Sequence, residues 1–281
     1  MMRPSHLKYL FTVTLVLFIT ARAQATSLTT VNKSCICNAE VMDSLEEPQS
    51  FNYGKFQGQC IDSCRFRAAR ILEKSPALSV GNILHLGSYY KATIPWEHFA
   101  KIEMGFEEFL PGISHVLLRF TLDEKAPSIK LVNQTDLTKS PIEVRSLVIS
   151  SEGVPPKDHK YSLLESYFGH YLLAHRLVTG QELDRWIAEY KHPLKFVELQ
   201  VNKESIGKIF LQGVQESDAK RLQNIYALFS NNCSTSAFSF IDSEVKASRT
   251  SWERFEEALP IAGPIGTLRS LFNRNLAKPE L

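Results

Sequence analysis

The sequence predicts an α+β fold in which an antiparallel sheet packs on helices. Segments with strand-like alternation and β-branched residues are concentrated before residue 150, whereas helical spacing of apolar residues dominates after it. Runs of strands followed by runs of helices are typical of α+β proteins. The chain of 281 residues is long enough for one large domain with its own core.

Residues 1–23 have the three parts of a secretory signal peptide. Arg3 and Lys8 give a positive start, residues 10–19 form an apolar core, and Ala-Arg-Ala at 21–23 fits the small-x-small rule for cleavage. The apolar core is short for a bilayer whose hydrocarbon layer is about 30 Å thick, which favours a cleaved signal over a retained anchor. We therefore expect an exported protein of the bacterial envelope, either periplasmic or secreted.

Charge and hydropathy narrow the class of partner. The formal net charge is +2 and the basic residues are scattered, which argues against a nucleic-acid-binding surface. No stretch after the signal approaches the roughly 18 apolar residues that a transmembrane helix needs. The expected division is a signal peptide (1–23), an N-terminal cysteine-containing segment (24–80), a main domain (81–245) and a C-terminal tail (246–281).

Four of the five cysteines are clustered near the start of the mature chain: Cys35, Cys37, Cys60 and Cys64. In an oxidising compartment they can form two disulfides, and because Cys35 and Cys37 are too close to bridge each other readily, each is expected to pair with Cys60 or Cys64. The spacing leaves open which pairs with which. A four-cysteine zinc site is the alternative, which the export signal disfavours.

Local patterns predict the elements of the first half of the chain. Residues 39–59 are polar and rich in turn formers, which indicates a loop. Residues 62–74 carry an apolar stripe at helical spacing, and Ser75-Pro76 would end that helix. Alternating and β-branched segments then predict strands over residues 82–90, 101–106, 114–122, 129–132 and 143–150.

Helical spacing dominates the second half. It extends over residues 161–190 and is followed by a strand at 196–201, two helices at 205–215 and 219–229, a helix from Cys233 to about residue 242, and an amphipathic stretch at 267–274. His170 and His175 are five positions apart, which does not place them on one helical face for a metal ion. We expect neither a metal nor a cofactor.

Cys233 is the candidate nucleophile, because it is the odd cysteine of an exported chain. Asn231 and Asn232 precede it as favourable N-cap residues, so its sulfur would lie at the positive end of a helix. That position stabilises a thiolate, and the first turn, with Asn232 and Ser234 flanking the sulfur, can cap the helix or hold an oxyanion.

His115 is the candidate base, since it begins a strand in which Val116, Leu118, Phe120 and Leu122 form one face. A third group should orient the histidine, and the next strand offers Ser146, Ser150 and Glu152, of which we favour Glu152. Arg119 lies on the same face of the strand as His115. It can either bind a substrate phosphate or carboxylate or neutralise a nearby carboxylate of the protein.

Two segments, Gly112-Ile-Ser-His115-Val-Leu-Leu-Arg-Phe120 and Tyr226-Ala-Leu-Phe-Ser-Asn-Asn232-Cys233-Ser-Thr, resemble the Lnb N-terminal periplasmic domain family. The similarity extends to Tyr-Phe-Gly-His-Tyr at 167–171 and to the acidic, aromatic stretch 182–190, and covers roughly residues 81–242. It implies a circularly permuted papain-like (NlpC-like) thiol fold and acyl transfer through a Cys233 thioester, with His115 as base. The lack of a later membrane span distinguishes this chain from the lipoprotein N-acyl transferases that name the family.

Three functions remain open on the sequence alone. The first is an exported cysteine-dependent acyltransferase or hydrolase whose partner is an envelope lipid, a lipoprotein or a peptidoglycan-type substrate. The second is a cell-wall peptidase or amidase of NlpC type, and the third is a non-catalytic envelope binding protein. A lipid substrate predicts a wide apolar groove beside Cys233, a peptide substrate predicts a polar one, and a binding protein predicts a thiol far from His115 or buried as a small apolar side chain.

Overall fold

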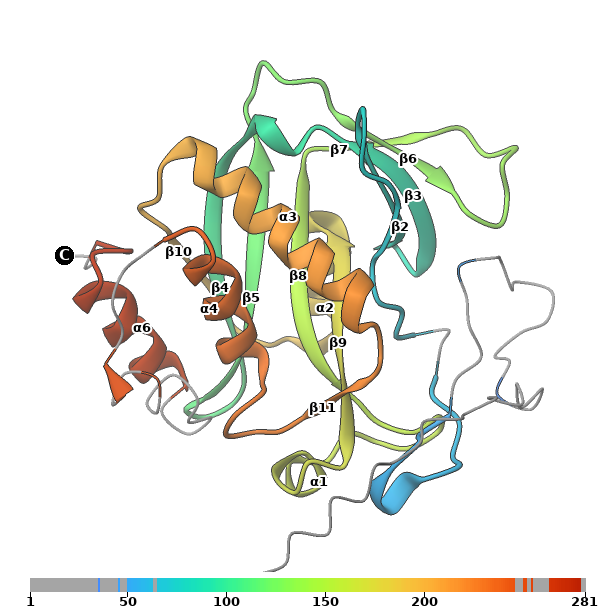
Figure 1. Ribbon diagram of the computed structural model, residues 1–281, viewed down its shortest axis with the longest axis vertical. Coiled ribbons are helices and arrows are strands. Elements are labelled where there is room, and N and C mark those ends of the chain that lie inside the picture. Colours follow the sequence, from blue (N-terminus) through green and yellow to red (C-terminus); the bar gives the residue numbers. More distant parts are fainter. Residues whose placement is uncertain are drawn as a thin grey trace, which may run out of the picture. The chain divides into compact units, whose positions relative to one another are not determined.

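An eleven-stranded, mostly antiparallel sheet forms the centre of the protein (Figure 1). The computed structural model describes residues 35, 45, 50–62, 65–245, 250–251, 254 and 263–278. The strand order is β10-β4-β5-β8-β9-β2-β3-β6-β7, with β1 paired to β2 and β11 paired to β9. Only β2 and β9 run parallel among these strands. The predicted α+β class with an antiparallel sheet is therefore confirmed.

The strands are β1 (Arg70–Glu73), β2 (Leu78–His85), β3 (Ser88–Ile94), β4 (Phe99–Leu110), β5 (Ile113–Leu122), β6 (Ile129–Asn133), β7 (Ile142–Val144), β8 (Ser146–Val154), β9 (Tyr171–Thr179), β10 (Leu194–Glu198) and β11 (Asn224–Tyr226). The helices are η2 (Gly54–Phe56), η3 (Trp96–His98), α1 (Leu163–Tyr167), α2 (Gly180–Tyr190), α3 (Lys203–Lys220), α4 (Cys233–Asp242) and α6 (Gly263–Asn273). The predicted strands at 101–106, 114–122 and 129–132 and the helix from Cys233 are confirmed.

The helix predicted over residues 62–74 is wrong where the structure describes it. Residues 70–73 form β1, which pairs with β2 so that Ile71 lies opposite Val80. The strand predicted over 82–90 is two strands, because Leu86 and Gly87 turn the chain with φ of 45° and 79°. The apolar run in β1 is so short that it fits both the helical and the strand period, and its pairing with β2 makes it a strand.

The continuous helical region predicted between residues 161 and 190 is interrupted by β9. All nine residues of β9 are buried, so the strand has no polar face and no alternation to reveal it. The flanking α1 and α2 are helical as predicted. The helix predicted over 219–229 is also wrong, since α3 ends at Lys220 and residues 224–226 form β11, which pairs with β9.

Helices cover both faces of the sheet. Figure 1 shows α3 and α4 in front of the central strands and α2 behind them. Val116, Leu118, Phe120 and Leu122 of β5 belong to the core that includes α3 and α4, whereas Leu117 belongs to the core that includes Leu183 of α2. The predicted two-faced pattern of β5 is therefore confirmed.

A disulfide joins Cys35 to Cys60 beside a cluster that contains Phe51, Phe56 and Ile61. It fits an exported protein, and it removes two of the four ligands that the alternative zinc site requires. Cys37, Cys64 and the signal peptide at 1–23 lie outside the described residues. Across the part of the chain that the structure describes, no helix is both long and apolar enough to cross a membrane.

Candidate active site

Cys233 is the first residue of α4, and Asn232 is the N-cap. The Asn232 side chain accepts a hydrogen bond from the Thr235 backbone N–H at 2.9 Å, and the Thr235 hydroxyl accepts one from the Asn232 N–H at 2.9 Å. This reciprocal pair is a capping box, which holds the first turn of the helix. The Ser234 hydroxyl contacts that of Thr267 at 3.0 Å, so α6 also braces the turn. Cys233 is a buried free thiol, 8% exposed.

The start of β5 lies against this sulfur. The Val116 backbone N–H donates to Cys233 Sγ at 3.4 Å, and the neighbouring His115 is close enough that the charges of His115 and Cys233 shift each other's pKa. Because α4 packs on β5, the helix start and the start of the strand meet. The structure thus brings together the two candidate residues, which are 118 positions apart in the sequence.

A serine lies between the histidine and the carboxylate. His115 Nε2 contacts Ser150 Oγ at 2.7 Å, and the Ser150 hydroxyl donates to Glu152 Oε1 at 2.9 Å. Since the only hydroxyl proton of Ser150 goes to Glu152, the serine oxygen accepts from His115 Nε2–H. That bond fixes the protonated nitrogen as Nε2 and leaves Nδ1 as the nitrogen for Cys233. Ser150, one of three candidates on this strand, therefore makes the direct contact with the ring, and Glu152 acts through it.

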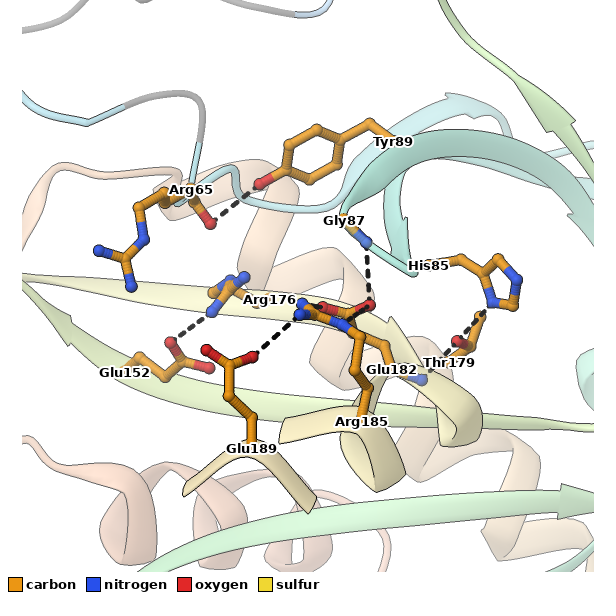
Figure 2. A network of polar contacts seen from close by, with 10 residues as sticks. All are labelled: Arg65, His85, Gly87, Tyr89, Glu152, Arg176, Thr179, Glu182, Arg185 and Glu189. Atoms are coloured by element: carbon orange, nitrogen blue, oxygen red, sulfur yellow. Dashed lines mark hydrogen bonds and ion pairs between the residues drawn. The ribbon is translucent and has the colours of Figure 1, made fainter. Parts of the chain in front are cut away.

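Arg176 completes this chain of contacts. Its Nη1 donates to Glu152 Oε2 at 2.6 Å, as Figure 2 shows. Strand register explains the grouping, because Ser150 is paired with Leu117 on β5 and with Arg176 on β9. Directly paired residues point to the same face of an antiparallel sheet, and residues two apart on a strand do too. His115, Ser150, Glu152 and Arg176 therefore share one face.

The electrostatics favour a charged pair. Burial raises the pKa of the Cys233 thiol, but the His115 cation and the backbone N–H groups of Val116 and Ser234 outweigh it, so the pKa lies below its ordinary value. Burial likewise lowers the pKa of His115, but the Cys233 thiolate, followed by the Glu152 carboxylate, raises it to about 9. A thiolate and an imidazolium coexist between these two pKa values.

Tyr226 of β11 lines the same cavity as Cys233. Burial, followed by the negative charge of Cys233, raises the pKa of Tyr226 well above its ordinary value, so the phenol stays protonated beside the thiolate. Sequence reasoning assigned Tyr226 no role, although it opens the segment that carries the resemblance. Nor did it assign one to Arg176, which lies in the strand that was expected to be helical.

A cavity of about 1050 Å³ opens onto these groups and is lined by Cys233, His115, Glu152 and Tyr226 among others. Its walls carry many ionisable side chains, including Arg65, Lys160, Arg176, Glu182, Arg185 and Glu189. Aromatic rings also line it, including Phe66, Phe109, Tyr161, Trp186 and Tyr190. The cavity is therefore large, and it mixes charged and aromatic groups.

Arg119 does not line this cavity. Its Nε donates to Glu103 at 2.7 Å and its guanidinium lies 3.5 Å from the centre of the Phe196 ring. Arg119 thus neutralises a carboxylate of the protein, and a role in binding substrate does not fit its position. Among the residues that the structure describes, no group of three or more His, Cys, Asp or Glu side chains is arranged to hold a metal ion.

Searches against protein-family models, curated proteins and solved structures find no match to this chain. The interpretation of the site therefore depends on its own geometry.

Proposed function

We propose that this protein is an exported cysteine-dependent acyltransferase or hydrolase, with Cys233 as nucleophile and His115 as base and acid. One observation carries the proposal: the thiol at the N-terminus of α4 accepts a hydrogen bond from the Val116 backbone, and the adjacent His115, whose charge lowers the pKa of the thiol, has its Nε2 held by Ser150. A nucleophile, a base and a group that orients the base are the parts required for thiol catalysis. A thiol kept only as a small apolar core side chain would need none of these partners.

The first chemical step is attack of the Cys233 thiolate on the carbonyl carbon of an ester or amide. The carbonyl oxygen becomes an oxyanion, for which the N–H groups at the start of α4, including that of Ser234, are the available donors. His115 then gives its Nδ1 proton to the leaving oxygen or nitrogen, and the acyl group stays on sulfur as a thioester.

The second step regenerates the thiolate. Neutral His115 takes a proton from water or from an acceptor alcohol or amine, which attacks the thioester carbonyl carbon. The carbon–sulfur bond breaks, and Cys233 leaves as a thiolate beside the newly formed imidazolium. Throughout both steps the Ser150 hydroxyl, oriented by Glu152, holds the His115 ring in the same orientation. Water as acceptor makes the protein a hydrolase, and another nucleophile makes it a transferase.

The architecture supports a circularly permuted papain-like arrangement. In this proposal the histidine strand β5 comes before the cysteine helix α4 in the chain, and the orienting group lies on β8, the strand next to β5. This is the order that the resemblance to the Lnb N-terminal periplasmic domain implies. The Cys35–Cys60 disulfide supports an oxidising compartment, as export to the bacterial envelope predicts.

A peptidase or amidase of NlpC type is the second candidate, and the charged cavity favours it. A long acyl chain calls for an apolar groove beside the nucleophile, whereas Arg65, Lys160 and Glu189 line this cavity. Amide substrates with charged groups match such walls better than a lipid chain does.

Acylation of the purified protein by a 4-nitrophenyl ester tests the proposal. We expect a burst of nitrophenol and a hydroxylamine-sensitive acyl group on the peptide that contains Cys233. Cys233→Ala should abolish both, and His115→Gln should slow the burst, whereas His98→Gln, at an exposed histidine of η3, should leave it unchanged. An acyl adduct that persists in Cys233→Ala would overturn the assignment of the nucleophile.

A further inference from the structure

Two guanidinium groups at one end of the cavity share an aromatic ring. The guanidinium carbons of Arg65 and Arg176 lie 5.7 Å and 5.1 Å from the centre of the Phe66 ring. The Arg176 carbon is also 4.9 Å from the Trp186 ring. Figure 2 shows both arginine side chains extending toward Glu152. Since both arginines line the cavity, this end of it has two cations and flat apolar walls.

The guanidinium groups of Arg65 and Arg176 have few hydrogen-bond acceptors. Within the described residues, Glu152 is the acceptor for Arg176 Nη1, and Arg176 Nε is buried without a hydrogen-bond partner. The Arg65 guanidinium forms no ion pair within the described residues. The nearby Asp62 carboxylate accepts a hydrogen bond from the Arg65 backbone N–H instead. A guanidinium as buried as that of Arg176, 6% exposed, is usually compensated by more than one contact.

The other carboxylates at this end are already engaged. Glu182 is fully buried and accepts from the Gly87 N–H at 3.1 Å, and it also pairs with Arg185 at 2.5 Å. Glu189 pairs with the same arginine at 3.1 Å (Figure 2). Both carboxylates therefore form ion pairs with Arg185, and Glu182 acts on Arg176 only through its charge, without a hydrogen bond.

We propose that Arg65 and Arg176 form a subsite for an anionic group of the substrate, a carboxylate or a phosphate. Planar guanidinium groups bind both anions through paired N–H donors, and the Phe66 and Trp186 rings limit the orientation of the bound group. The inference deepens the proposed function and rests on it, because it takes Cys233 as the group that reacts in the same cavity. The substrate class is then an ester or amide that also has an anionic group.

Maleimides that differ only in their terminal group provide the test. The probes are N-hexylmaleimide, 6-maleimidohexanoic acid and the phosphonate of the same chain length, with rates normalised to those for glutathione. We expect the anionic probes to modify Cys233 about tenfold faster than the neutral one, the effect of one charge-assisted hydrogen bond. The ratio of carboxylate to phosphonate rates distinguishes the two anions.

Arg65→Gln should remove most of this advantage and leave the rate with the neutral probe unchanged. Lys91→Gln is the matched control, because it removes one exposed positive charge on β3, outside the cavity, and should preserve the advantage. Equal rates for all three probes on the unmodified chain, or an advantage that survives Arg65→Gln, would overturn the subsite.

A second measurement separates failure of the subsite from failure of the nucleophile. Glutarate and inorganic phosphate should raise the melting temperature of the unmodified chain and of Cys233→Ala, because a ligand that binds the folded state stabilises it. Neither should do so in Arg65→Gln. If no maleimide labels Cys233, the proposed function fails while this shift still decides the subsite; a shift that is absent, or unchanged in Arg65→Gln, overturns the subsite alone.

Discussion

Replacing Ser150 with alanine isolates the contribution of one hydrogen bond to the charge on His115. The substitution removes the 2.7 Å contact to Nε2 and, with it, the link to Glu152. A hydrogen bond that involves a charged group contributes about 1.5 to 3 kcal/mol. One pKa unit corresponds to about 1.36 kcal/mol. Neutral His115 keeps its Nε2–H, so the bond to Ser150 exists in both protonation states, and only the extra strength of a charged donor, about 1 to 1.5 kcal/mol, affects the pKa. The pKa of His115, about 9 in the intact site, should therefore fall by roughly one unit.

The rate of alkylation by iodoacetate measures this change. The anionic reagent is attracted by the imidazolium, so its rate with the Cys233 thiolate should fall as His115 loses its proton, with a midpoint near 9. In Ser150→Ala the midpoint should move to about 8.

Ser151→Ala is the matched control for Ser150→Ala. Ser151 is the adjacent residue and contacts a different histidine, His175, at 2.8 Å. Its removal should leave the iodoacetate midpoint near 9. A midpoint that stays there in Ser150→Ala as well, or that moves equally in both variants, would refute the role of Ser150.

Four further substitutions, of which Asn202→Ala is a control, test other contacts. Asn232→Ala and Asn202→Ala each remove an N-cap, of α4 and α3, and should each lower the free energy of unfolding by about 1 kcal/mol in urea titrations. Only Asn232→Ala should also slow alkylation of Cys233, and equal slowing by both would contradict a local effect. Tyr226→Phe should raise the pKa of Cys233, measured by thiolate absorbance, because it removes a polar hydroxyl beside the thiolate; an unchanged pKa would show that the hydroxyl does not stabilise it. Burial, reinforced by Lys220, lowers the pKa of His175 from 6.5 to about 4. The unfolded chain therefore binds a proton first as the pH falls. This difference of about 2.5 pKa units should remove about 3 kcal/mol of stability between pH 6.5 and about 4. His175→Gln should flatten that decline, and a decline as steep as in the unmodified chain would assign it to other groups.

The start of α4 was predictable because its signal is local. Two asparagines precede a run with helical spacing, and a polar N-cap followed by a helix is recognisable without tertiary information. The face of β5 that packs against α3 and α4 was predictable for a similar reason, since its apolar residues alternate with period two. The expectation that His115 meets Cys233 began from the strand context of His115 and was strengthened by the resemblance, because no local pattern connects positions so far apart.

The residues that follow His115 in the chain of contacts, Ser150, Glu152 and Arg176, were harder to predict. Strand periodicity places Ser150 and Glu152 on one face, but it does not say which of them lies nearer to β5. Arg176 was harder to predict for another reason, because all residues of β9, including His175 and Arg176, are buried, so the strand lacks the polar–apolar alternation that would distinguish it from a helix. Tyr226 lies in a strand of only three residues, which is too short to have a period.

The side chains from Arg176 to Cys233 form a chain of contacts along which the charges alternate in sign. Arg176 is positive, Glu152 is negative, Ser150 is a neutral connection, His115 is positive and Cys233 is negative. Burial opposes the charged forms of Glu152, His115 and Cys233, and for Glu152 it is Arg176, followed by His115, that keeps the pKa below its ordinary value. Each of these three charges is thus stabilised by a neighbouring group of opposite charge. Arg176 also lines the cavity, so an anion in the proposed subsite would bind beside Glu152. Such binding would be coupled to protonation of His115 through Arg176 and Glu152.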